Sequence, residues 1–225
     1  MTNTLPHTLG NLGKIKRFVV DDQVEGQVLE YRCEVLEVNG AVRKLKTTGG
    51  QGEPTYFISY RSDDITLTVE VDGLVLPKIM AYFGEQPTLY RDFPLIGTER
   101  FHFPFILNSS SLYPKEERNE IFINDESPHM SENRDVLARA MKAAIAFGSW
   151  LVENGAKDRY AIAYSRLPEV GLKEGAEKWY RDQQREWRKA LLELPLVECA
   201  NKTTVRLKEA VIPKHGSAGD VQEAF

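Results

Sequence analysis

The residues best suited to chemistry, histidines and cysteines, are scattered along this chain. The histidines are His7, His102, His129 and His215. None of them stands at metal-ligand spacing from another histidine or cysteine, so the sequence predicts no metal site. Cys33 and Cys199 form no CxxC pair, which favours two buried thiols in a reducing compartment over a disulfide.

Motifs for nucleophilic or phosphate chemistry are also missing from the sequence. It contains no GxSxG elbow and no HExxH helix. The glycine-rich stretch 48–54 (TGGQGEP) has neither GxGxxG spacing nor a GK[ST] ending, so we interpret it as a flexible hairpin loop. A hydrolase or nuclease whose site has no recognised motif stays open as an alternative.

The loop 114–120 (PKEERNE) packs five charged residues between an apolar strand and a helix. One interpretation is a solvated turn. The other is a guanidinium, that of Arg118, presented at the edge of a domain, where its planar fork can pair with phosphate oxygens.

Composition is that of an ordinary globular protein. The chain has 225 residues, of which 42% are hydrophobic and 28% charged, and its formal net charge is −4. That charge disfavours a nucleic-acid-binding surface spread over the whole chain. No apolar run is long enough to span a bilayer and the N-terminus lacks a signal core, so we expect a cytoplasmic protein without a membrane partner.

The elements that must position these residues divide into a β-rich half and a helical half. Alternating apolar residues over 14–108 predict an antiparallel meander with a hairpin turn at Asn39-Gly40. We predict that one strand buries Ile65, Leu67, Val69 and Val71 together. The segment from Pro87 to Asn108 is expected to hold two further strands, and the short IFIND segment (121–125) another. Its dense aromatic cluster predicts core: Tyr82, Phe83, Tyr90, Phe93, Phe101, Phe103 and Phe105.

Two helices are predicted in the second half. The first runs from Arg134 to Asn154, capped by Ser131 or Asn133 and stopped by Asn154-Gly155. Its apolar stripe is Val136, Leu137, Ala140, Met141, Ala144, Ile145, Gly148 and Leu151. The second runs over 172–194 and buries Trp179, Trp187 and Leu191.

The predicted fold class is therefore α+β, a mostly antiparallel sheet with two or more helices packed against it. We set apart a leader over 1–13, a module over 14–199 (β-rich 14–108, helix-rich 131–199) and a polar tail or linker over 200–225.

The stretch 90–125, YRDFPLIGTERFHFPFILNSSSLYPKEERNEIFIND, resembles the region C-terminal to the nucleotide-binding domain in bacterial sacsin-like proteins of the GHKL ATPase superfamily. The resemblance is strong over 92–124 and weaker over the rest of 14–199. It implies a fold like the middle domain of the ninety-kilodalton heat-shock chaperones.

The chain departs from that superfamily at the nucleotide site. It has no DxGxG loop, and Glu120 with Asn124 is only an accidental match to ExxxNxxD, because Ser127 stands at the place of the aspartate. The resemblance therefore implies a non-catalytic, middle-domain-like module that binds no cofactor alone, as a natural truncation, a split gene product or an excised domain. ATP and Mg²⁺ belong to an ATPase domain in cis or in trans, which the module couples to an unknown protein client. By the same resemblance, Arg118 is the candidate contact to the nucleotide phosphate in trans. A stand-alone protein-interaction scaffold is the other alternative.

Overall fold

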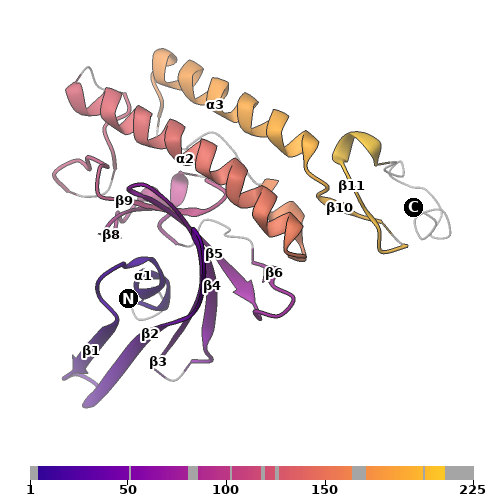
Figure 1. Ribbon diagram of the computed structural model, residues 1–225. Coiled ribbons are helices and arrows are strands. Elements are labelled where there is room, and N and C mark those ends of the chain that lie inside the picture. Colours follow the sequence, from indigo (N-terminus) through magenta and orange to yellow (C-terminus); the bar gives the residue numbers. More distant parts are fainter. Residues whose placement is uncertain are drawn as a thin grey trace, which may run out of the picture.

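The computed structural model describes residues 5–50, 52–80, 86–101, 103–117, 120–124, 127–163, 171–199 and 201–210. Within these ranges the fold is α+β, with a curled, mostly antiparallel sheet and three α-helices packed against it (Figure 1). The predicted fold class is confirmed.

The described strands of the main sheet follow the order β1-β2-β3-β4-β5-β9-β7-β8, with β6 also paired to β5. Their bounds are β1 Arg17–Asp22, β2 Gln27–Asn39, β3 Val42–Gly49, β4 Thr55–Ser62, β5 Ile65–Asp72, β6 Lys78–Ile79, β7 Leu89–Arg91, β8 Phe93–Pro94 and β9 Ile106–Ser109. A second, two-stranded sheet pairs β10 (Val197–Glu198) with β11 (Thr204–Val205). Short 3₁₀ turns cover Thr98–Arg100, Arg159–Ala163 and Leu207–Glu209.

The two faces of the main sheet have different partners. One face packs against α2 (Pro128–Glu153), and α3 (Glu174–Glu193) packs on α2 in turn (Figure 1). The predicted strand face is confirmed, since Ile65, Leu67, Val69 and Val71 are all buried in this larger core. The other face curls around α1 (Leu5–Asn11) and holds a smaller core.

Helix α1 lies within the stretch 1–13, which we set apart as a leader and for which the sequence pattern predicts no helix. Leu9 is fully buried against Phe57, Leu45 and Tyr31. Gly10 permits this close docking, because a Cβ there would stand 2.9 Å from the Phe57 ring. The helix is therefore an integral part of the small core.

Several predicted boundaries agree with the structure. The β2–β3 turn follows Asn39, and Gly40 has the positive φ of 56° that such a turn requires. Helix α2 ends at Asn154-Gly155, with Gly155 at φ 74°. Helix α3 ends at Glu193, before Pro195.

Other predictions were wrong or incomplete. Helix α2 begins at Pro128 with Ser127 as its N-cap, because proline suits the first helical position. Asn133 is therefore inside the helix and fully buried. Ile121 forms only an isolated bridge with Pro114, and residues 122–124 are bends instead of a strand. The pairing of β9 with β7 is parallel, which the sequence did not indicate.

The predicted core residues are mostly buried. Tyr90, Phe101, Phe103 and Phe105 are buried, Phe93 is 45% exposed, and Tyr82 and Phe83 lie outside the described residues. On the helices Trp187, Leu191 and Ala144 are buried, whereas Trp179 and Ile145 are only half-buried.

Two remaining expectations concern the membrane and the tail. No helix in the described ranges is long and apolar enough to cross a membrane. Within the predicted tail 200–225, β11 pairs with β10, while residues 211–225 fall outside the description.

Candidate functional site

A cleft of about 740 Å³ opens on the α1 side of the sheet, and we call it the polar cleft. Three segments form it: the end of α1 with the loop that follows, the inner face of β3–β5, and the ends of β7 and β9 with their turns. Its lining residues are Gly10–Lys16, Arg43, Leu45, Ser59, Arg61, Asp63, Asp64, Thr66, Asp92, Phe93 and Asn108–Ser110.

Asn108, at the end of β9, holds two walls of the polar cleft together. Its side chain is buried, its Nδ2 donates to the carbonyl oxygen of Asn11 at 2.8 Å, and its Oδ1 accepts from the Asp92 amide at 3.0 Å. Asp92 has the left-handed φ of 61°, and this hydrogen bond to its amide helps to fix that turn. Asn11 is itself buried, and among the described residues its Oδ1 atom has no hydrogen-bond partner.

Asp64 connects the polar cleft to helix α2. One carboxylate oxygen accepts from Arg139 Nη1 at 2.5 Å, and the other accepts from the hydroxyl of Ser109 at 2.8 Å. These hydrogen bonds, that of Arg139 above all, hold the pKa of Asp64 well below its usual range. Asp64 is therefore a structural anion whose charge is already compensated.

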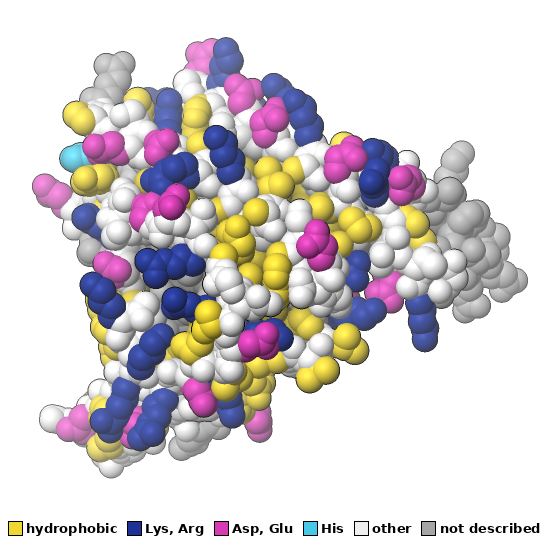
Figure 2. Space-filling view, in the orientation of Figure 1, with side chains coloured by type: hydrophobic (Ala, Val, Ile, Leu, Met, Phe, Trp, Pro, Cys, Tyr) yellow, Lys and Arg dark blue, Asp and Glu magenta, His cyan; other side chains and the backbone are white. Residues whose placement is uncertain are grey.

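The cleft carries more positive than negative uncompensated charge. Lys14 and Lys16 face it from the loop after α1, and Arg43 and Arg61 face it from β3 and β4. Figure 2 shows Lys and Arg side chains gathered over the region of α1. Within the described part of the chain, no ion pair is formed by any of these four cations. An excess of unpaired cations in a protein of net charge −4 suits an acidic ligand.

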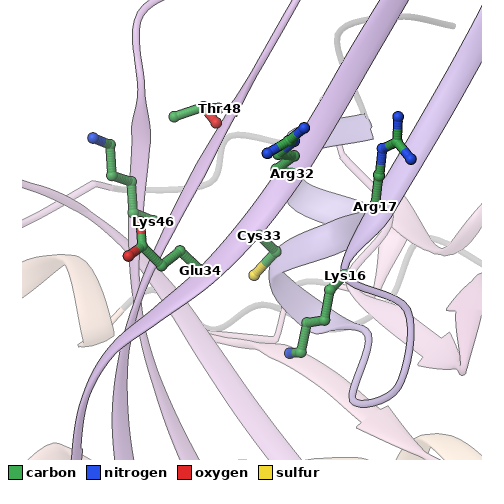
Figure 3. A pocket seen from close by; sticks show the side chains of 7 residues that line it. All are labelled: Lys16, Arg17, Arg32, Cys33, Glu34, Lys46 and Thr48. Atoms are coloured by element: carbon green, nitrogen blue, oxygen red, sulfur yellow. The ribbon is translucent and has the colours of Figure 1, made fainter.

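A second hollow, on the outer face of β1–β3, is less suited to binding. Figure 3 shows Arg17 and Arg32 extending from neighbouring strands beside Glu34 and Lys46. Arg17 and Arg32 both bind one carboxylate oxygen of Glu30, at 2.6 and 2.5 Å, and they lower the pKa of Glu30 to about 2. These positive charges already have an anionic partner.

Cys33 lines the second hollow, but its thiol is not suited to nucleophilic chemistry. Burial raises the pKa of the Cys33 thiol, so it stays protonated at neutral pH and is a poor nucleophile. Cys33 is buried as predicted, whereas Cys199 is only half-buried, and both are free thiols.

Arg118, the site residue that the resemblance implies, lies outside the described residues. The ends of its loop are described. The Lys115 amide donates to the Glu120 carbonyl oxygen at 2.8 Å, and the Lys115 ammonium pairs with the Glu120 carboxylate at 2.7 Å. The buried Asn133 side chain binds both the amide and the carbonyl of Tyr113 and the carbonyl of Phe122, at 2.8 to 2.9 Å. Helix α2 thus fixes both sides of the loop.

The described histidines do not gather into a site. His7 on α1 contacts Glu70 on β5 at 2.6 Å, and His129 contacts Glu132 at 3.0 Å. Among the residues that the structure describes, no three His, Cys, Asp or Glu side chains lie close enough to hold a metal ion. His102 and His215 are outside this set.

Sequence reasoning did not identify the cations of the polar cleft. The alternation along β3 does place Arg43 on the same face as Leu45. What it cannot show is that α1 covers only part of this face and leaves a cleft beside it. No protein-family model, no curated protein and no solved structure matches this chain.

Proposed function

We propose that this chain is a non-catalytic module of a sacsin-like GHKL ATP-binding protein, which couples an ATPase domain, in cis or in trans, to protein partners. In this proposal the ATPase domain holds ATP and Mg²⁺. The module docks on it through the polar cleft.

The observation that carries the proposal is the place of the resembling segment in the fold. Residues 92–124 are the part most similar to sacsin-like proteins, and Asp92, Phe93, Asn108 and Ser109 of that segment line the polar cleft. The Asn108 side chain accepts a hydrogen bond from the Asp92 amide and donates one to the carbonyl oxygen of Asn11 at the end of α1. The segment therefore builds a surface feature as well as core.

The charge of the polar cleft indicates what docks there. Lys14 and Lys16 line the cleft from the loop after α1, and Arg43 and Arg61 line it from β3 and β4, so an acidic segment in the cleft meets cations from two parts of the fold. Complementary charge of this kind speeds encounter and sets orientation more than it adds affinity. Such a contact suits a domain that must associate and separate with nucleotide state.

The proposal predicts that a gene near this one encodes an ATPase domain with DxGxG and ExxxNxxD motifs, and the test combines that domain with the purified chain. The chain alone should neither bind a fluorescent ATP analogue nor release phosphate. Calorimetry should show that the ATPase domain binds the chain, and that binding weakens by about tenfold or more in Arg43→Glu/Arg61→Glu, because two attractive contacts become repulsive.

The double charge reversal Arg185→Glu/Lys189→Glu serves as the matched control. Both residues are exposed on α3, away from the cleft, so the affinity should stay within error. Phosphate release that follows the chain through purification and disappears on one substitution would make it an enzyme and end the proposal. Equal affinity of the two double variants would remove the polar cleft from the interface.

A further inference from the structure

Within the described residues, strand β1 is the longest edge strand of the main sheet. It lies at one end of the strand order and spans six residues, Arg17–Asp22 (Figure 1). The opposite edge, β8, has two residues and contains Pro94, which has no amide proton to donate. The outer edge of a strand as long as β1 offers a row of unpaired backbone groups on which a further strand can pair.

The backbone groups that β1 leaves unpaired can be identified from its register. The Cys33 amide donates to the Lys16 carbonyl oxygen at 2.8 Å, and hydrogen-bonded pairs then recur at every second residue of an antiparallel ladder. The amides and carbonyls of Arg17, Val19 and Asp21 therefore point away from β2. Elsewhere in the described chain, none of these groups has a backbone partner.

The side chains of β1 are complementary to a second, antiparallel copy of the same strand. When a two-fold axis passes through Val19, the outward-pointing groups of Val19 face those of Val19 in the second copy. Arg17 then stands opposite Asp21 of the second copy, and Asp21 opposite Arg17. This register pairs the free backbone groups with one another and puts opposite charges face to face twice.

The apolar residues of β1 agree with this register. Phe18 and Val20 point toward the small core around α1 and are only half-buried, and they stand opposite each other across the two-fold axis. On the outer face Val19, 51% exposed, meets its own copy. Shifting the second copy so that Asp21 faces Asp21, or Arg17 faces Arg17, puts like charges together.

We propose that β1 is a homodimerisation edge, where two copies of this chain join their sheets into one through antiparallel β1–β1 pairing centred on Val19. Arg17 remains available for the partner, since only its Nε is needed for the 2.6 Å contact with Glu30 and its side chain is 59% exposed. The contact is small, so the dimer belongs to the weak, concentration-dependent class.

Sedimentation equilibrium of the full chain at increasing concentrations tests whether the chain forms this dimer. The mass should rise from 25.6 kDa toward twice that value. Arg17→Asp and Asp21→Arg should each weaken dimerisation by about tenfold or more, because symmetry makes each like-charge contact occur twice. Glu25→Arg, an equal charge reversal in the exposed β1–β2 turn, should leave the dimer unchanged.

Mixing the two charge variants gives the sharpest readout. In a heterodimer of Arg17→Asp with Asp21→Arg, an aspartate of the first variant faces an arginine of the second at both contacts between positions 17 and 21. The mixture should therefore dimerise, although each variant alone should not. Val19→Pro provides an independent test, because it removes an outward amide and leaves the β1–β2 hydrogen bonds in place. Circular dichroism confirms that each variant is folded.

Two results would overturn the proposal. One is a wild-type chain whose mass remains 25.6 kDa at all concentrations up to its solubility limit. In that case β1 does not pair with a second copy, and a strand of another protein would be the remaining partner for this edge. The other is a dimer whose affinity the two charge variants and Val19→Pro do not change.

Discussion

Asn133 shows how one buried side chain can organise a loop. It lies on α2 and is completely buried. Its side chain makes hydrogen bonds with the amide and carbonyl of Tyr113 and with the carbonyl of Phe122, so these backbone groups have partners. A buried polar group is stable only when such hydrogen bonds are made. The charged loop that follows Tyr113 therefore depends on a residue of the helix.

We expect Asn133→Ala to lower the free energy of unfolding by roughly 2–3 kcal/mol, because it leaves these backbone groups unsatisfied. Urea denaturation followed by circular dichroism measures the change. Glu132→Ala, one residue earlier and exposed, should stay within about 0.5 kcal/mol of wild type. Equal stability of the two variants would show that Asn133 does not support the loop.

Asp64 should make the protein sensitive to acid. Its pKa is lower in the folded state than in the unfolded state, so its contribution is fully present above the unfolded pKa of about 3.9 and is lost as pH falls from there through the folded pKa. Asp64→Asn should cost roughly 1 kcal/mol at pH 7, since solvent partly screens the pair with Arg139.

The difference between Asp64→Asn and wild type should shrink below about pH 4, because Asp64 of the unfolded chain then binds a proton that Asp64 of the folded protein does not yet bind. Urea denaturation of both proteins at a series of pH values measures this difference in the free energy of unfolding. The control is Asp72→Asn, at the exposed end of β5, for which we expect little change. A difference that grows as the pH falls would contradict the assignment of Asp64 as a stabilising anion.

At the scale of elements, helix α2 joins the two halves of the molecule. Its buried stripe packs against β4 and β5 on one side, and it contacts α3 on the other. The Arg139–Asp64 pair adds a polar contact between α2 and the β4–β5 turn. Movement of α2 would therefore be felt at both the polar cleft and the charged loop.

Ala144→Asp should be strongly destabilising, by about 3 kcal/mol or more, because it buries an unpaired charge at a fully buried position of α2. Thermal unfolding measures the effect, and a variant that does not fold would agree with the prediction. Ala146→Asp makes the same change on the exposed face of the same helix and should have a small effect. If both variants melt at the wild-type temperature, the stripe does not face a core.

At the scale of the whole molecule, the proposed module works only together with an ATPase domain. The polar cleft lies beside α1, whereas the described residues on either side of Arg118 precede α2 in the chain. In the proposal the cleft provides docking, and Arg118 provides a charge that reaches the nucleotide when the domains close.

In that complex, Arg118→Ala should lower kcat substantially and leave the affinity for ATP nearly unchanged, because the guanidinium meets charge that develops on the γ-phosphoryl group. Arg118→Lys should restore part of the rate, as a point charge without the planar fork. Steady-state hydrolysis and nucleotide titration separate the two effects. Arg91→Ala is the control: Arg91 stacks on the ring of Tyr113, so its loss should act through stability. An unchanged kcat in an assembled complex would leave Arg118 as a solvated residue.

Elements whose signals are local could be predicted from the sequence. Alternation identified the strand with Ile65 and Leu67, the Asn39-Gly40 pair identified a hairpin, and three- and four-residue spacing identified the buried stripe of α2. Each of these signals acts over a few residues, because it reflects backbone conformation or the burial of one face.

Which residues form a surface together depends on long-range contacts, which the sequence pattern does not reveal. Seven residues at the start of the chain gave no helical signal, since α1 is stabilised by docking on Phe57 and not by its own propensity. The sequence pattern predicts Asn133 as a helix cap, whereas in the structure its side chain is buried inside α2 and binds backbone groups of the preceding loop. The polar cleft joins Lys14, Arg43 and Arg61 with Asn108 because the sheet curls around α1, and such long-range contacts leave no periodic trace in the sequence.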